Sequence, residues 1–292
     1  MKAVIPAAGL GSRFLPATKA QPKEMLPVVD KPAIQYIVEE ALEAGVDEVI
    51  IVNSRDKKSI EDQFSPHDVL VKHLRGVGKD AYADAVEHAG ALPVKFVYQD
   101  EPLGLGHAVH VAAPETGDDM FFVMLGDVLV PDNAMCQKMR AISDEHGGAS
   151  VIAVLPVSDD EVSRFGIIGG DDLGNDVWKV TEMVEKPALE DAPSNLASFG
   201  RYLLSPTVME LLATTEPGAG GEIQLTDALK RLAKQQEVYA YDFKGHRYDV
   251  GSKIGFLQAN IEFALRNPEV SGELKEYLDQ LHGNMDAMLD YE

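Results

Sequence analysis

Residues 3–11, with the sequence AVIPAAGLG, decide the fold of this chain. Three apolar residues lead into a glycine turn, as they do where a buried strand ends in a loop. After a long loop, apolar residues recur at helical spacing and stop at Gly45, which is typical of the end of a helix. A strand, a glycine turn and a helix in this order indicate an α/β fold. The helical apolar positions are Ile34, Ile37, Val38, Ala41 and Leu42.

Short apolar runs alternate with helix-length segments through the first half of the chain. The runs cover residues 49–52, 94–98 and 121–125. Every residue of 121–125 is apolar, which favours a central strand covered on both faces. This alternation predicts βαβ units and a parallel sheet.

The pattern changes in the second half, where residues 164–204 show shorter β segments with glycine turns. This change predicts a small antiparallel insertion on the substrate side. We therefore expect a Rossmann-like, three-layer α/β/α fold with a mostly parallel sheet, formed by residues 1–270 and followed by a helical tail at 271–292. The other expected elements are helices at 133–146, 207–213 and 225–235 and strands at 149–157 and 238–241.

Net charge narrows the classes of partner. The 292 residues include 48 acidic and 26 basic side chains, for a net charge of −22. A surface this acidic repels nucleic acid and anionic lipid, so we expect neither as a partner.

The single cysteine, Cys136, excludes an internal disulfide. Residues 1–11 lack an apolar signal segment, and no apolar run approaches the ~20 residues of a membrane span, so we expect a cytoplasmic protein.

The glycine turn is followed by a group of cations. Gly9 and Gly11 match the first two glycines of the dinucleotide fingerprint, but Phe14 stands at the third, and no P-loop ending follows. Residues 1–31 carry five bases and two acids, against a large acidic excess elsewhere. Backbone N–H groups beside Arg13 and Lys23 are suited to phosphate, which predicts a phosphate-binding turn. The alternative is an ordinary loop whose bases are solvated.

Two aspartates lie where the carboxyl ends of the strands are expected, which is the edge at which open α/β sheets bind ligands. Asp127 follows the buried strand at 121–125, and Asp249 lies between a predicted strand and a helix. Either could hold Mg²⁺ at the carboxyl edge of the sheet, although Asp249 could equally be a helix N-cap.

Glu185 and Lys186 precede a proline, which favours an extended Lys186. Adjacent extended side chains point apart, so the pair can meet one ligand only across a bend. The alternative is an exposed ion pair.

Residues 5–32, IPAAGLGSRFLPATKAQPKEMLPVVDKP, resemble the N-terminal signature of the bacterial-type UTP–glucose-1-phosphate uridylyltransferases, within the sugar nucleotidyltransferases. Three further blocks agree with this resemblance: QDEPLGLGHA at 99–108, EKP at 185–187 and GEIQLTDA at 221–228. Two positions depart from the pattern: Ser12 replaces the usual threonine, and Gly126 precedes Asp127 where this branch more often has proline. The Gly-Asp form resembles thymidylyltransferases and N-acetylglucosamine-phosphate uridylyltransferases instead.

The resemblance implies a nucleotide-diphospho-sugar transferase fold and Mg²⁺-dependent synthesis of UDP-glucose from UTP and glucose 1-phosphate in a homodimer or homotetramer. It implies that Arg13, Lys23 and Asp127 are catalytic and that Asp127 and Asp249 bind the metal. The implied nucleotide-binding residues are Ala8, Gly9, Gly11, Arg13, Lys23, Gln99 and Gly104, and those for the sugar phosphate are Gly166, Glu185 and Lys186. The alternatives are a glucose-1-phosphate thymidylyltransferase, a non-catalytic nucleotide-binding regulator and a dinucleotide oxidoreductase.

His107 also invites a role as a catalytic base. A sugar phosphate is already deprotonated at neutral pH and needs no base. We expect His107 to help begin the helix after Gly106 instead.

Overall fold

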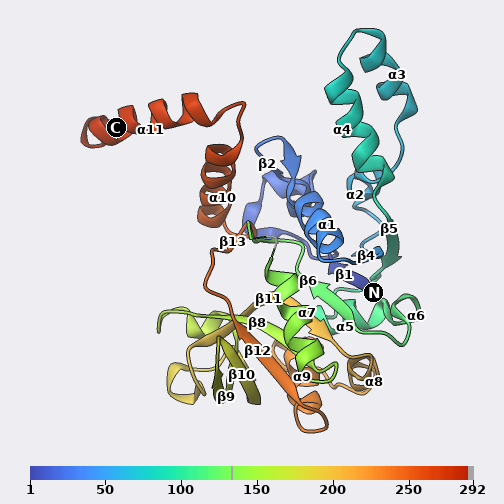
Figure 1. The fold of residues 1–292 in the computed structure, drawn as a ribbon, viewed down its shortest axis with the longest axis vertical. Coiled ribbons are helices and arrows are strands. Elements are labelled where there is room, and N and C mark those ends of the chain that lie inside the picture. The colour runs from blue at the N-terminus through green and yellow to red at the C-terminus, as the bar shows by residue number, and fades with distance from the viewer. Residues whose placement is uncertain (133, 289–292) are drawn as a thin grey trace.

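The computed structural model describes residues 1–132 and 134–288, in which nine strands form one sheet with helices on both faces (Figure 1). The predicted α/β class is confirmed. In order across the sheet, the strands are β5 (Val94–Tyr98), β4 (Glu48–Asn53), β1 (Lys2–Pro6), β6 (Phe121–Met124), β11 (Leu196–Leu204), β8 (Ser150–Pro156), β12 (Val238–Asp242), β10 (Val177–Glu185) and β9 (Gly166–Gly174).

The first four strands of this order are parallel, as predicted. β1 pairs with β4 and β6, so Val4 lies opposite Ile50 and Val123. Its residues alternate between two cores, because Ala3 and Ile5 belong to one buried cluster and Val4 to the other. The carboxyl ends of β5, β4, β1 and β6 therefore meet at one edge, where open α/β sheets bind ligands.

Most strands of the sheet run in one direction, as predicted, and β11 is one of the strands that run opposite to them and make the sheet mixed. It runs antiparallel to β6 and β8, and all of its residues are buried. Residues 164–204 therefore continue the main sheet: β9 and β10 extend one edge, and β11 lies in the middle. Gly200 and Arg201 interrupt the apolar run of β11, which is why its sequence does not indicate a central strand.

Helices bury their apolar sides against both faces of the sheet. The residues of the two buried clusters assign each helix to one face. The predicted helix at 133–146 is α7, and Asn133 lies outside the described residues. The face with Ala3 is covered by α1 (Ala33–Glu43) and α7 (Met135–Glu145), and the face with Val4 by α5 (Leu105–Val111), α6 (Ala113–Thr116), α8 (Thr207–Leu212) and α9 (Leu225–Leu232).

Two helical segments leave the body of the molecule (Figure 1). Between β4 and β5, α2 (Lys58–Gln63) is followed by α3 (Asp68–Gly76) and α4 (Asp80–Ala91), which pack on each other. At the other end, α10 (Lys253–Arg266) is followed by α11 (Ser271–Met288), which begins where the tail was predicted; residues 289–292 lie outside the described residues. No helix in the described part of the chain is long and apolar enough to cross a membrane.

Short elements shape the ligand edge. The antiparallel pair of β7 (Val128–Leu129) and β13 (Tyr248–Asp249) places Asp249 opposite Val128, next to Asp127. A second pair joins β2 (Pro27–Val28) to β3 (Lys31–Pro32). The 3-10 turns are η1 (Ser12–Phe14), η2 (Ala17–Lys19), η3 (Lys23–Met25), η4 (Val162–Arg164), η5 (Leu189–Asp191) and η6 (Ala219–Gly221).

Candidate active site

The conformation of the glycine turn after β1 is held by Gly11 and by a hydrogen bond from Thr18. Gly11 adopts φ +65°, a conformation that glycine reaches without strain, and η1 begins directly after it. The Thr18 hydroxyl donates a hydrogen bond of 2.7 Å to the carbonyl of Gly11. Arg13, on η1, keeps 59% of its side chain exposed and is therefore free to meet a ligand.

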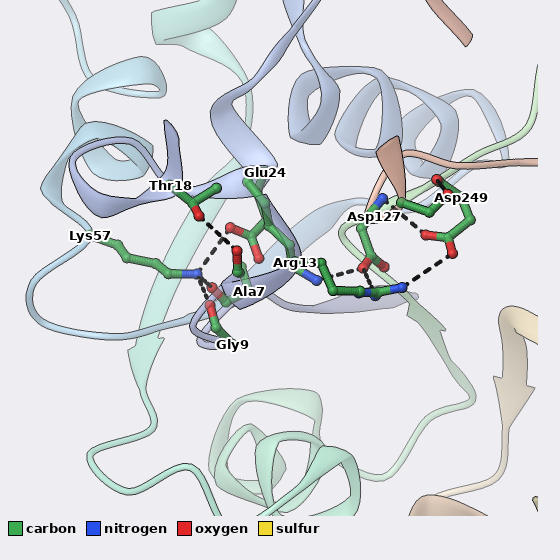
Figure 2. Close-up of polar contacts among 12 residues, drawn as sticks. Ala7, Gly9, Arg13, Thr18, Glu24, Lys57, Asp127 and Asp249 are labelled. Atoms are coloured by element: carbon green, nitrogen blue, oxygen red, sulfur yellow. Dashed lines mark hydrogen bonds and ion pairs between the residues drawn. The ribbon is translucent and has the colours of Figure 1, made fainter. Parts of the chain in front are cut away.

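Lys57, which was not predicted as a site residue, holds this turn through its backbone carbonyls. Its Nζ donates to the carbonyls of Ala7, over 2.5 Å, and of Gly9, over 2.6 Å, and lies 3.0 Å from Glu24 Oε2 (Figure 2). Both Lys57 and Glu24 are buried. The available signal was the position of Lys57 just after β4, because β4 neighbours β1 and ends at the same edge.

Lys57→Met is expected to destabilise the protein by about 1–3 kcal/mol and to raise the KM for nucleotide, since two carbonyls lose their donor. Burial raises the pKa of Glu24 even though Lys57 and Lys23 lower it, so Glu24 can take up a proton in the variant, which limits the loss. Because a raised acid pKa favours the fold at low pH, the loss is expected to grow as the pH rises. Urea unfolding measures it. Lys58→Met, at the exposed neighbouring position, is the control and should change neither quantity.

The four charged side chains predicted for the phosphate and the metal lie together. Figure 2 labels three of them, Arg13, Asp127 and Asp249. Lys23 Nζ donates to Asp127 Oδ2 over 2.5 Å. Arg13 bridges the two aspartates, with its guanidinium 3.8 Å from Asp127 Oδ2 and 3.5 Å from Asp249 Oδ2. The structure thus brings the phosphate-binding candidates and the metal-binding candidates into one cluster.

The charges of this cluster stabilise one another. Burial alone would lower the pKa of Lys23, but the negative charges of Asp127 and Glu24 outweigh it, so the pKa lies above its usual value. Burial alone would raise the pKa of Asp127, but the charge and hydrogen bond of Lys23, together with the charge of Arg13, hold that pKa below its usual value. Asp127 is therefore a carboxylate and Lys23 an ammonium at neutral pH.

The two aspartates form a donor set that suits Mg²⁺. Gly251 lies between them, and a Cβ at this position would stand 2.5 Å from Asp127 Oδ2 and 2.9 Å from Asp249 Oδ1. A side chain there would fill the space between the carboxylates. Mg²⁺ takes one or two protein carboxylates and completes its shell with phosphate oxygens and water. Among the described residues, no group of three or more His, Cys, Asp or Glu side chains could hold a metal.

A cavity of about 520 Å³ opens from this cluster toward the other half of the sheet, and Glu185 and Lys186 line it together. Lys186 adopts φ +46°, so the expectation of an extended Lys186 is wrong. The bend needed for the two side chains to converge is present. Glu185 Oε2 accepts a hydrogen bond of 2.6 Å from the hydroxyl of Thr226. Gly166 lies against both, since a Cβ there would be 3.1 Å from each of these oxygens.

Two arginines that the sequence analysis missed add positive charge to this cavity. Arg164 and Arg247 both line it, and their guanidinium carbons lie 5.9 Å and 4.8 Å from the ring centre of Phe165. Among the described residues, Arg247 Nε is buried without a hydrogen-bond partner. Burial lowers the pKa of Arg247, although Asp249 and Glu161 raise it. The available signal was the spacing of Arg247 and Asp249, two residues apart, which puts both on one face of a strand.

Gln99 and Gly104 lie apart from this cavity, on the loop after β5. Gln99 is buried, and its Nε2 lies 3.2 Å from the carbonyl oxygen of Gly104. Gly104 has φ +106°, and a Cβ there would be 2.8 Å from both the Ile223 carbonyl oxygen and Glu222 Cβ. Packing against residues 221–228 is thus one reason for this glycine. Whether the loop meets a nucleobase stays a prediction.

Comparison with known proteins identifies the family. A family model described as nucleotidyl transferase matches residues 2–265. The chain belongs to this family. A UTP–glucose-1-phosphate uridylyltransferase of Streptococcus pneumoniae serotype 4 is 50% identical over 285 residues, covering 96% of this chain and 95% of that relative.

Solved structures of other nucleotidyl transferases have the same fold. A UTP-bound UGPase from Acinetobacter baumannii matches with a TM-score of 0.88 and 40% identity over 96% of this chain and 99% of that one. A UDP-glucose pyrophosphorylase complexed with UDP-glucose matches with a TM-score of 0.82 and 40% identity, over 91% and 99% of the two chains. The resemblance seen in the sequence, and with it the assignment as a nucleotidyl-transferring enzyme, is confirmed.

Proposed function

We propose that this nucleotidyl transferase forms UDP-glucose by transferring the uridylyl group of UTP to glucose 1-phosphate, with release of pyrophosphate. The observation that carries the proposal is the shared site: Arg13 bridges Asp127 and Asp249 at the wall of the cavity that Glu185 and Lys186 line. One cavity thus contacts the glycine turn proposed to bind the triphosphate, the two carboxylates and the cationic pocket. The names of the relatives support UTP and glucose 1-phosphate as the substrates.

On the nucleotide side, backbone groups of Ala8, Gly9 and Gly11 approach the nucleotide. Their turn is preformed, because Lys57 and Thr18 already occupy its carbonyls. Arg13 and Lys23 hold the triphosphate, and Gln99 and Gly104 contact the base. Arg13 is exposed, and its contacts with the two aspartates are long, at 3.8 and 3.5 Å, so it can turn from them to a phosphate.

On the sugar side, Glu185 accepts hydrogen bonds from the hydroxyls of glucose and Lys186 binds its phosphate. Thr226 orients the Glu185 carboxylate, and Gly166 leaves room for the ring. Arg164 and Arg247 line the same cavity, and their guanidinium groups suit a phosphate. The pocket thus balances the charge of a sugar phosphate within an acidic protein.

The reaction needs positioning and charge rather than a protein nucleophile. An oxygen of glucose 1-phosphate attacks the α-phosphorus of UTP in line, and the bond to the leaving pyrophosphate breaks. Arg13 and Lys23 face the charge that develops on the pyrophosphate, and the fixed pocket holds the two anions in register. Bound at Asp127 and Asp249, Mg²⁺ would supply further positive charge to the phosphate oxygens.

The thymidylyltransferase alternative was motivated by Gly126, and packing explains this residue without reference to the base. A Cβ at Gly126 would lie 3.0 Å from the carbonyl oxygen of Pro6. This packing removes the reason for considering dTTP, and the names of the relatives favour UTP.

One assay tests the proposal against its rivals. Each nucleoside triphosphate is supplied with glucose 1-phosphate and Mg²⁺, and pyrophosphate release is measured. We expect release with UTP, its loss on addition of EDTA and its recovery with excess Mg²⁺. Preference for dTTP would indicate a thymidylyltransferase, and UTP binding without release would indicate a regulator.

Glu185→Gln is expected to raise the KM for glucose 1-phosphate about tenfold or more, with little change in the KM for UTP, because a charge-assisted acceptor of sugar hydroxyls is lost. Initial rates at varied glucose 1-phosphate measure this effect. Glu182→Gln, at an exposed position of the same strand, is the matched control. Unchanged sugar kinetics in Glu185→Gln would remove this residue from the site.

The assembly is proposed to be a homodimer or homotetramer. Ile254, Leu257 and Ile261 form an apolar stripe on α10 and are 64%, 56% and 41% exposed. A stripe of this kind favours self-association.

Several expectations from the sequence stay predictions. They are the cytoplasmic location, the lack of a nucleic-acid or membrane partner, and the boundaries of the catalytic domain and tail.

A further inference from the structure

The loop after β5 places a histidine against the side-chain amide of Gln99. Gln99 is 7% exposed, and its Nε2 lies 2.9 Å from His107 Nδ1 and 3.2 Å from the Gly104 carbonyl oxygen. His107 lies in the first turn of α5, and Gly104 directly precedes that helix. His107 therefore does more than help begin the helix.

These contacts determine the orientation of the Gln99 amide. The carbonyl oxygen of Gly104 can only accept a hydrogen bond, so the amide end that faces it must be the NH₂ group. The second N–H of this group then points at His107 Nδ1, which must accept. The neutral His107 ring consequently carries its hydrogen on Nε2.

The other end of the amide is left for a ligand. Within residues 1–132 and 134–288, Gln99 Oε1 accepts no hydrogen bond, since both side-chain contacts of Gln99 involve Nε2. Oε1 is also not one of the fully enclosed polar atoms without a partner, so it reaches the surface. The loop thus presents a preoriented acceptor beside a buried amide.

We propose that His107 is a positioning residue that sets the nucleobase preference. His107 Nδ1 accepts a hydrogen bond from Gln99 Nε2 and thereby keeps Gln99 Oε1 directed toward the base. An oxygen in this place accepts from the N3–H of uracil, whereas N3 of cytosine carries no hydrogen and would oppose the oxygen with its own lone pair. The inference rests on the proposed function, which places the base of UTP against Gln99.

Two variants of His107 distinguish the effect of losing the hydrogen-bond acceptor from the effect of losing the imidazole ring. His107→Leu removes the closer of the two acceptors, so only the Gly104 carbonyl, at 3.2 Å, still opposes rotation of the amide. His107→Asn retains an acceptor, since its Oδ1 can occupy the place of Nδ1. The measured quantity is the ratio of kcat/KM for UTP to that for CTP. His107→Leu is expected to lower this ratio about tenfold or more, and His107→Asn to keep it within about twofold of the wild-type value.

A role for His107 in folding alone would lower both kcat/KM values by one factor and leave their ratio unchanged. An unchanged ratio in His107→Leu therefore overturns the proposal. An equal fall of the ratio in both variants overturns it too, because the acceptor would then not be what matters.

A measurement on the unaltered protein applies if His107→Leu does not fold. Long-range ¹H–¹⁵N NMR is expected to show the His107 ring with its hydrogen on Nε2, and a hydrogen on Nδ1 would overturn the proposal. Calorimetric affinities for UTP and CTP, without glucose 1-phosphate, give the nucleotide preference in the absence of turnover. Failure of the wild type to release pyrophosphate would thus contradict the proposed function while leaving this test intact.

Discussion

Asp127→Asn is expected to lower kcat about 100- to 1000-fold or more while the protein stays folded. The substitution keeps the shape of the side chain but removes the negative charge that faces Lys23 and Arg13 and that would hold Mg²⁺. Arg13 is 59% exposed, and Lys23, although only 18% exposed, keeps the nearby negative charge of Glu24, so neither cation is left buried without a counter-charge. Pyrophosphate release at saturating UTP and glucose 1-phosphate gives kcat, and circular dichroism checks the fold.

Asp84→Asn is the matched control for this prediction. Asp84 also pairs with an arginine, Arg75, over 2.8 Å, but on the exposed surface of α4. Its replacement is expected to leave kcat unchanged. Near-normal turnover of Asp127→Asn would remove this carboxylate from the reaction, and an equal loss in both variants would point to a general effect of charge.

Arg201→Met is expected to destabilise the protein by about 3–5 kcal/mol, because it leaves a buried carboxylate without its partner. Arg201 is fully buried and holds Glu40 through two hydrogen bonds of 2.8 and 2.6 Å. Burial opposes the charge of Arg201, but Glu40 outweighs it and raises the pKa of the guanidinium. Urea unfolding measures the free energy of unfolding.

The double variant Arg201→Met/Glu40→Leu is expected to recover most of this loss, since removing both charges also removes the cost of burying them. Arg266→Met is the surface control: Arg266 pairs with Glu262 at 3.4 Å, where both side chains are about half exposed, and it should cost less than about 1 kcal/mol. If Arg201→Met were no worse than this control, the pair would not stabilise the core.

Local patterns in the sequence were sufficient for much of the fold. The apolar run before Gly9 gives β1, and the period of α1 and the fully apolar β6 follow from short windows. The position of Asp127 after β6 gave its place at the ligand edge, because the end of a parallel strand determines where the next residues emerge. Asp249 joined it through the β7–β13 pair.

Interactions between distant segments were beyond such patterns. Arg201 and Glu40 are separated by 161 positions, and each alone resembles an ordinary surface charge. Lys57 likewise stands in a polar stretch, and only the folded chain brings it to the carbonyls of Ala7 and Gly9. Buried charges of this kind are determined by their partners, which a sequence window does not contain.

Arg201 also donates a hydrogen bond of 2.7 Å to the carbonyl of Val128, the residue that follows Asp127. A single guanidinium therefore joins the buried Glu40 to the residue next to Asp127, the carboxylate proposed to serve the reaction. We therefore expect a change that loosens α1 or β11 around this group to shift Asp127 as well. Substitutions at this buried pair should then lower thermal stability and turnover together, although they lie outside the cavity.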